Sequence, residues 1–74
     1  METYIDILLN SDGKNASFIE KKLLKIGLKT SMGEHDFIYD WKRIVSPSEI
    51  INLADKIHSE LKGSGAIIKI TTMR

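Results

Sequence analysis

Cysteine is absent from this chain, and proline occurs only once, at position 47. Without cysteine, neither a disulfide nor a thiolate metal site can stabilise the fold, and nothing indicates an oxidising compartment. A single proline together with 42% hydrophobic residues is typical of a compact globular domain rather than of a disordered segment. The 74 residues suffice for one hydrophobic core, so we expect a single domain over residues 1–74.

Long apolar runs are missing as well. No stretch approaches the roughly 20 residues that a membrane-spanning helix needs, and the first residues lack the pattern of a secretory signal. These features predict a cytoplasmic protein that does not use the membrane. The net charge of +1 gives, by itself, no argument for nucleic acid or for an acidic partner.

The hydrophobic pattern predicts four strands and two helices. In chain order, we expect a strand at 3–9, a helix that ends at Gly27, a short strand at 28–31, a strand at 36–42, a helix that begins at Pro47 and ends at Gly63, and a strand at 66–72. This β-α-β-β-α-β order is that of a ferredoxin-like α+β sandwich. In that fold, two helices cover one face of a four-stranded antiparallel sheet.

Capping signals mark the start of each helix. Asn15 or Ser17 can cap the first helix, and Ser17 with Glu20 fits a capping box. The segment Ser46-Pro47-Ser48-Glu49 is a stronger signal, because serine caps, proline suits the first helical position and glutamate completes the box.

The strand at 36–42 separates aromatic from acidic side chains. Phe37, Tyr39 and Trp41 share one face, whereas Asp36 and Asp40 lie on the other. Because unpaired aspartates are costly to bury, we expect the aromatic face to pack on the helices. The aromatic residues are therefore interpreted as core rather than as a stacking site for bases or a cofactor.

The sheet face that the helices leave uncovered is expected to be mixed in character. Its expected members are Tyr4, Asp6, Leu8, Ile38, Asp40, Ile67 and Lys69. This set is too apolar for a purely solvated surface and too charged for a core. We therefore expect the face to be an interface between copies of the chain, in a homo-oligomer that is most simply a dimer.

Two polar turns hold the candidate binding residues, because binding groups usually sit on loops of a rigid scaffold. These residues are Gly33, Glu34, His35 and Asp36 in one turn and Gly63, Ser64 and Gly65 in the other. We expect the two turns to be neighbours at the rim of a ligand site. Asp36 has two interpretations, since its carboxylate could brace the hairpin through backbone amides or could accept a hydrogen bond from a ligand amine.

The two histidines are candidates for catalytic or metal-binding roles. His35 lies between Glu34 and Asp36 and could act as a general base or as a ligand. However, no residue in the sequence is identifiable as the nucleophile that catalysis would need. For metal binding, His35 and His58 lack the spacing that directs two ligands to one metal. We expect no metal and no cofactor, while an enzyme that uses His35 or Asp36 stays open as an alternative.

A stripe of lysines on the first helix raises a further alternative. Lys21, Lys22 and Lys25 fall within about 100° of one another at helical spacing, and Lys14 and Lys29 extend the line. Such a stripe could bind RNA. A solvated face is favoured because no exposed aromatic residue is interleaved for base stacking, so nucleic acid is not an expected partner.

The second half of the chain resembles known families. The run Gly33-Glu34-His35-Asp36 before an apolar strand, followed by a helix, a glycine turn and a strand that ends in Thr71-Thr72, is similar to the ligand-sensing domain of Lrp/AsnC-type regulators. It resembles equally the GYD-type dimeric α/β-barrel proteins and, more loosely, ACT domains. His35 stands where those families usually have tyrosine. The resemblance implies a domain that dimerises through its open sheet face and binds a small molecule, often an amino acid, near the subunit boundary.

The expected function is therefore a small non-enzymatic binding or regulatory module. The alternatives are a dimeric α/β-barrel-type enzyme and an RNA-binding module.

Overall fold

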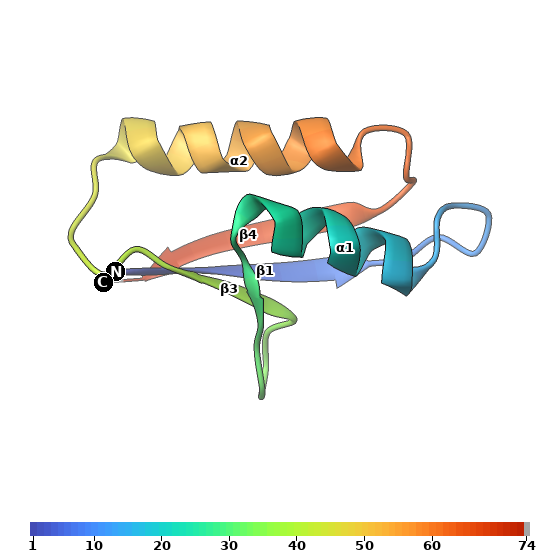
Figure 1. Ribbon diagram of the computed structural model, residues 1–74, viewed down its shortest axis with the longest axis horizontal. Coiled ribbons are helices and arrows are strands. Elements are labelled where there is room, and N and C mark those ends of the chain that lie inside the picture. Colours follow the sequence, from blue (N-terminus) through green and yellow to red (C-terminus); the bar gives the residue numbers. More distant parts are fainter. Residues whose placement is uncertain (74) are drawn as a thin grey trace.

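The computed structural model describes residues 1–73 and contains the six expected elements (Figure 1). They are β1 (Glu2–Leu8), α1 (Ala16–Ile26), β2 (Lys29–Thr30), β3 (Phe37–Asp40), α2 (Pro47–Leu61) and β4 (Ile67–Met73). The strands form one antiparallel sheet in the order β2-β3-β1-β4. The expected ferredoxin-like α+β sandwich is thereby confirmed.

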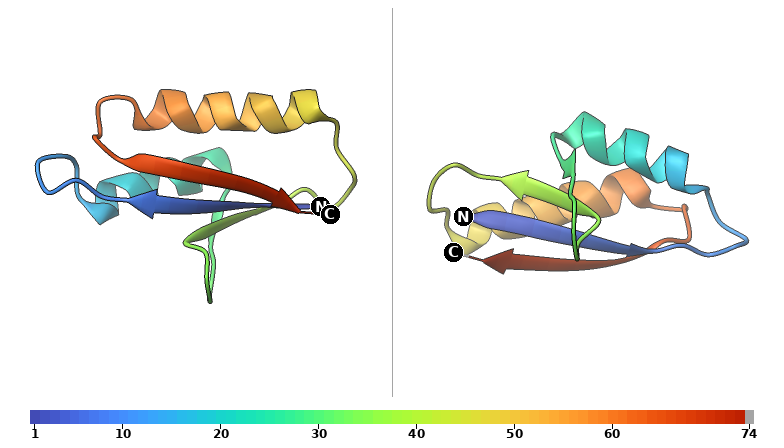
Figure 2. Two further views of the ribbon diagram at one scale, coloured as in Figure 1. Left: turned by 180° about the vertical axis from the view of Figure 1, so that it is seen from behind. Right: turned by 90° about the horizontal axis from the view of Figure 1, so that it is seen from below.

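Both helices lie on the same face of the sheet, and the core fills the space between the two layers (Figure 1). Ile5 of β1, Leu23 of α1 and Ile57 of α2 are completely buried. The helices contribute these residues because their apolar positions recur every three or four residues and form one stripe. Within residues 1–73, the other face of the sheet carries no helix (Figure 2).

The two helices begin at capped residues, but only one capping box is present. The Asn15 side chain accepts a hydrogen bond from the Phe18 amide and caps α1, so the box expected from Ser17 and Glu20 is wrong. An Asn cap already satisfies an amide of the first turn, and Ser17 falls inside the helix. At α2, the box between Ser46 and Glu49 is confirmed.

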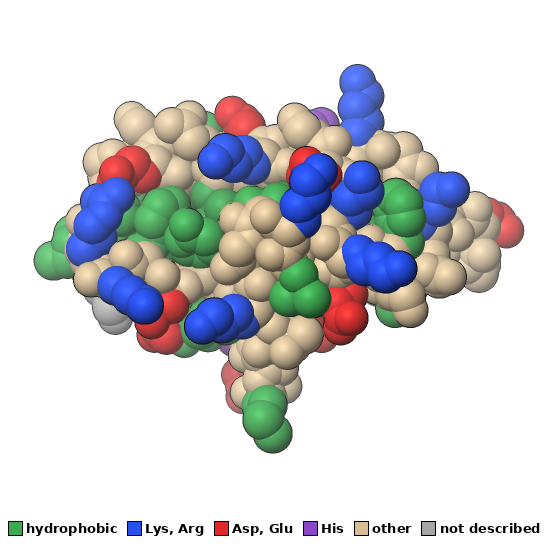
Figure 3. Space-filling model, in the orientation of Figure 1, with side chains coloured by type: hydrophobic (Ala, Val, Ile, Leu, Met, Phe, Trp, Pro, Cys, Tyr) green, Lys and Arg blue, Asp and Glu red, His purple; other side chains and the backbone are tan. Residues whose placement is uncertain are grey.

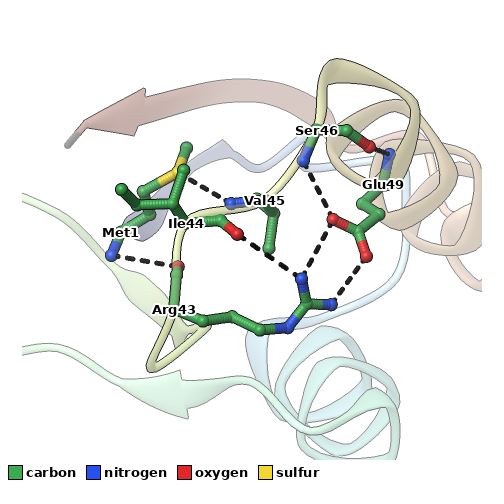
Figure 4. Close-up of polar contacts among 6 residues, drawn as sticks. All are labelled: Met1, Arg43, Ile44, Val45, Ser46 and Glu49. Atoms are coloured by element: carbon green, nitrogen blue, oxygen red, sulfur yellow. Dashed lines mark hydrogen bonds and ion pairs between the residues drawn. The ribbon is translucent and has the colours of Figure 1, made fainter.

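An ion pair ties the link before α2 to its first turn (Figure 4). The Arg43 guanidinium donates to both carboxylate oxygens of Glu49, at 2.6 and 3.2 Å. The hydrogen bond from Arg43, together with the backbone amide of Ser46, lowers the pKa of Glu49. Met1 reaches the same link, since its sulfur accepts from the Val45 amide and its amino group donates to the Arg43 carbonyl.

The third strand is shorter than the sequence pattern predicts. It covers Phe37–Asp40 rather than 36–42, and at each of its ends an aspartate side chain bonds a backbone amide. The Asp36 carboxylate accepts from the Ile7 amide, and that of Asp40 accepts from the Lys42 amide. Lys42 takes a φ of 60°, so the chain turns there and leaves the sheet.

Trp41 follows the strand but keeps the predicted orientation toward the helices. It is partly buried and packs against the core, and its ring meets that of Tyr39 edge-on with 4.8 Å between ring centroids. Its indole N–H donates to the hydroxyl of Thr3 at 2.8 Å, and Thr3 is completely buried. The aromatic face is therefore part of the core, as expected.

Replacing Trp41 separates the contribution of its packing to stability from that of its indole hydrogen bond. Trp41→Phe keeps most of the apolar contact but removes the indole donor, so we expect the free energy of unfolding to fall by about 1 kcal/mol. Trp41→Ala also loses the packing and should cost about 3 kcal/mol. Urea unfolding followed by circular dichroism measures both, with Met32→Ala at a fully exposed side chain as the neutral control. Equal, small losses for both Trp41 variants would contradict a packed indole.

Candidate functional site

The hairpin between β2 and β3 projects from the sheet on the side opposite to the helices (Figures 1 and 3). The amide of Ser31 donates to the carbonyl of Asp36 and closes the loop at its base. Gly33 has a φ of 115°, as the sequence predicts, and a side chain there would be strained. Met32 is fully exposed at the turn. The hairpin therefore forms a wall beside the uncovered face of the sheet.

Asp36 braces this hairpin against β1. Its amide donates to the carbonyl of Ile5, and its carboxylate accepts from the amide of Ile7 at 2.8 Å. The side chain thus adds a contact between the hairpin and β1 just before the first residue of β3. One carboxylate oxygen makes this bond, so the group keeps acceptor capacity for a ligand.

His35 and Asp6 form a second contact between the hairpin and β1. The imidazole Nδ1 lies 3.0 and 3.1 Å from the two carboxylate oxygens of Asp6, and both side chains are 29% exposed. The His35 ring also stacks on Tyr4, with 4.5 Å between ring centroids. The imidazole is held in place from two sides, which fixes its orientation on the open face.

Tyr4 connects this cluster to an acidic end of the sheet. Its hydroxyl donates to the carboxylate of Glu2 at 3.3 Å, and Glu2 lies opposite Asp40 in the strand register. Burial, followed by the charges of Glu2 and Asp40, raises the pKa of Tyr4. The hydroxyl therefore remains a neutral donor over the physiological range.

The open face carries every residue predicted for it. Alternation along β1 and the register with β3 and β4 place Tyr4, Asp6, Leu8, Ile38, Asp40, Ile67 and Lys69 there together. Leu8 and Ile67 are direct partners in the ladder, and they are 67% and 69% exposed. Met73, at the opposite end of β4, is 55% exposed. Among residues 1–73, the face is thus mixed in character and open.

A groove of about 300 Å³ lies on the other side of the hairpin base, beside α1. We call it the α1 groove, and it is lined by Ile7, Leu9, Ala16, Ile19, Glu20, Thr30, Asp36 and Phe37. Its walls are mainly apolar, and its charged members are the carboxylates of Glu20 and Asp36. Its size is at the lower end of the range for small-molecule sites. No sequence pattern predicts this groove, because its residues come from β1, α1, β2 and β3 and from the loops beside them.

The glycine turn before β4 does not join the hairpin. Ser64 is buried, its carbonyl accepts from the Lys14 amide, and its hydroxyl accepts from the Ala66 amide. Gly13 packs so closely on the Ser64 backbone that a side chain there would clash. The structure therefore places Gly63, Ser64 and Gly65 against the loop between β1 and α1, apart from Gly33, Glu34, His35 and Asp36 (Figure 2).

Lysines gather over α1, but part of this stripe is already bound (Figure 3). Lys22 and Lys25 both lie 3.7 Å from the carboxylate of Glu60 on α2, and Lys14 and Lys22 lie over the ring of Phe18.

Within residues 1–73, no group of three or more potential metal-ligating side chains comes together. None of the helices described is both long and apolar enough to cross a membrane.

Comparisons with protein-family models, with curated proteins and with solved structures found no match for this chain. The resemblance to Lrp/AsnC-type and GYD-type domains thus stays a hypothesis based on short motifs.

The brace made by Asp36 can be tested by two substitutions. Asp36→Asn keeps a side-chain oxygen for the Ile7 amide, so we expect little change in the free energy of unfolding. Asp36→Ala removes the acceptor and should cost about 1 kcal/mol. Chemical unfolding compares the two, and Glu34→Ala, in the same exposed hairpin, is the control. A stability of Asp36→Ala equal to that of the unchanged protein would contradict the brace.

Proposed function

We propose that this chain is a cytoplasmic, non-enzymatic binding module that self-associates through its open sheet face and binds a small amine such as an amino acid. The observation that carries the self-association is the composition of that face. Leu8 and Ile67 form an adjacent apolar pair that is about two-thirds exposed, and partly exposed Tyr4 and Ile38 pair further along the same face, beyond Asp6 and Lys69. Apolar side chains gathered on one face of a small domain favour burial against another protein surface.

The charges on the open face favour a second copy as the partner. Glu2 and Asp40 are side by side at one end of the face, where like charges in cross-strand positions are unfavourable. Lys69 lies further along β4, opposite Asp6. A second copy rotated about a two-fold axis can set its Lys69 against the acidic pair, and the contact then occurs twice.

The projecting hairpin supports the same arrangement. It stands beside the open face and carries the fully exposed Met32. A second sheet that packs on this face would also lie against the hairpin wall, and the His35–Asp6 pair would then become an interface contact. The surface buried in this interface would include the aromatic ring of Tyr4.

The α1 groove supports binding of an amine with an apolar substituent. The carboxylates of Glu20 and Asp36 attract a cation, while Ile7, Ile19 and Phe37 offer an apolar wall. A free amino acid or alkylamine matches both properties and the volume of about 300 Å³. This site replaces the paired turns that the sequence predicted, because the glycine turn lies elsewhere.

One observation favours the enzyme alternative. His35 is oriented by Asp6, which is how a general base is held in many active sites. Among residues 1–73, however, the ring is in contact with Tyr4 and Asp6, and neither Tyr4 nor Asp6 is an activated nucleophile. The pair therefore fits a contact on an interface better than a catalytic base.

Sedimentation velocity at micromolar concentration tests the interface. The unchanged protein should sediment as a dimer or larger species, and Ile38→Lys should shift it toward a smaller species because it places a charge beside Tyr4 on the open face. Ile51→Lys is the matched control, since Ile51 is 58% exposed on α2 and lies away from that face. A monomer in the unchanged protein, or equal dissociation by both variants, would overturn the open-face interface.

Thermal unfolding in the presence of small ligands tests the groove. An alkylamine such as isobutylamine should raise the melting temperature, whereas the matching alcohol should not, because only the amine carries the charge that the carboxylates attract. Glu20→Gln should reduce the shift, and Glu34→Gln, outside the groove, should leave it intact. Equal shifts with amine and alcohol, or no shift with any amine or amino acid, would refute this site.

A further inference from the structure

The free edge of β4 is a second candidate surface, separate from the open face. β4 is the outermost strand, pairs with β1 over seven consecutive residues and has no bulge in that register. Proteins usually protect a long edge strand with proline, several charges or a covering segment. β4 contains no proline and has Lys69 as its charged residue, and the views in Figure 2 leave its outer edge uncovered. The opposite edge, β2, is protected by its length of two residues.

Hydrogen bonds of β1 determine which backbone groups of β4 face outward. The carbonyls of Met1 and Ile5 accept from the amides of Trp41 and Asp36, so the odd-numbered residues of β1 direct their backbone groups toward β3. Because successive residues of a strand alternate, the even-numbered residues of β1 bond to β4.

Register then identifies the outward groups. The even-numbered residues of β1 are opposite the odd-numbered residues of β4, from Ile67 to Met73. The amides and carbonyls of Ile68, Ile70 and Thr72 therefore point to the free edge. Within the part of the chain that the structure describes, β1 is the only strand hydrogen-bonded to β4.

We propose that β4 pairs antiparallel with β4 of a second copy, with Ile70 opposite Ile70 of that copy. This register is the one that uses all three outward residues, because Ile68 then lies opposite Thr72 and each such pair exchanges both N–H···O bonds. The two four-stranded sheets join into one sheet of eight strands. The helices of both copies lie on the same side of it.

Side chains on the open face fit the same register. Ile67 comes to lie opposite Met73, so two side chains that are 69% and 55% exposed cover each other. Lys69 lies opposite Thr71 rather than opposite the second Lys69, which avoids a destabilising pair of like charges. These two matches favour a second copy of this chain over an unrelated strand as the occupant of the edge.

Cysteine cross-linking tests the register directly, because the chain has no cysteine of its own. In the proposed pair, Lys69 and Thr71 of the second copy form a non-hydrogen-bonded pair with Cα atoms about 4.5 Å apart, which a disulfide can bridge. Two Lys69 residues would be about 8 Å apart, too far for a relaxed disulfide. Both positions are on the open face, so the substitutions leave the core unchanged.

Lys69→Cys and Thr71→Cys proteins are mixed in equal amounts and oxidised, and the disulfides are identified by mass spectrometry under non-reducing conditions. The expected result is that the mixed disulfide predominates, with little homodisulfide from either variant alone. A statistical mixture of products, or no disulfide between folded chains, overturns the edge pairing. Circular dichroism of each variant establishes that the chains are folded.

The same experiment in the Ile38→Lys background separates the edge from the open face. Ile38 is on β3, two strands away from the free edge of β4, so the mixed disulfide should persist when the open-face contact is broken. Loss of the mixed disulfide in this background would show that the cysteines met across the open face and would overturn the edge pairing. When both contacts form, Ile38→Lys should reduce a larger assembly to the edge-paired dimer in sedimentation.

Discussion

A four-stranded sheet has two faces, and residues 1–73 place helices on only one of them. β1 and β4 are each seven residues long, and α1 and α2 cover only the inner side of these strands. The core on that side is closed by completely buried Ile5, Leu23 and Ile57. The outer side keeps Leu8 and Ile67 largely exposed, and this imbalance is the reason to expect a second protein surface against the sheet.

β1 links the candidate sites to one another. It is central in the sheet, its backbone is bonded on both sides, and its outward-facing side chains include Tyr4 and Asp6. The amide of Ile7 anchors Asp36, and the carboxylate of Asp6 anchors His35, so the hairpin is held to β1 at two points. The same alternation of β1 directs the outward groups of β4 to its free edge. The groove, the open face and the edge therefore depend on one strand register.

Local signals in the sequence were sufficient to predict the order of helices and strands, but not to predict which residues come together in the candidate site. The capping box at Ser46 and the positive φ of Gly27 involve neighbouring residues, so the sequence pattern alone predicts them. The contact between Asp6 and His35 spans 29 positions and depends on strand register, which periodicity does not determine. For the same reason, the sequence could not show that Ser64 packs on the loop after β1 instead of beside the hairpin.

Solvent accessibility of methyl groups, measured by NMR with a soluble paramagnetic agent, tests the central claim that the open face is covered by a second copy. Leu8 and Ile38 lie on that face, while Ile44 and Ile51, 76% and 58% exposed, lie outside it and are internal references. As protein concentration rises, the methyl signals of Leu8 and Ile38 should become protected, and those of Ile44 and Ile51 should stay accessible. Leu8 and Ile38 methyl groups that remain as accessible as the references at every concentration would contradict the account.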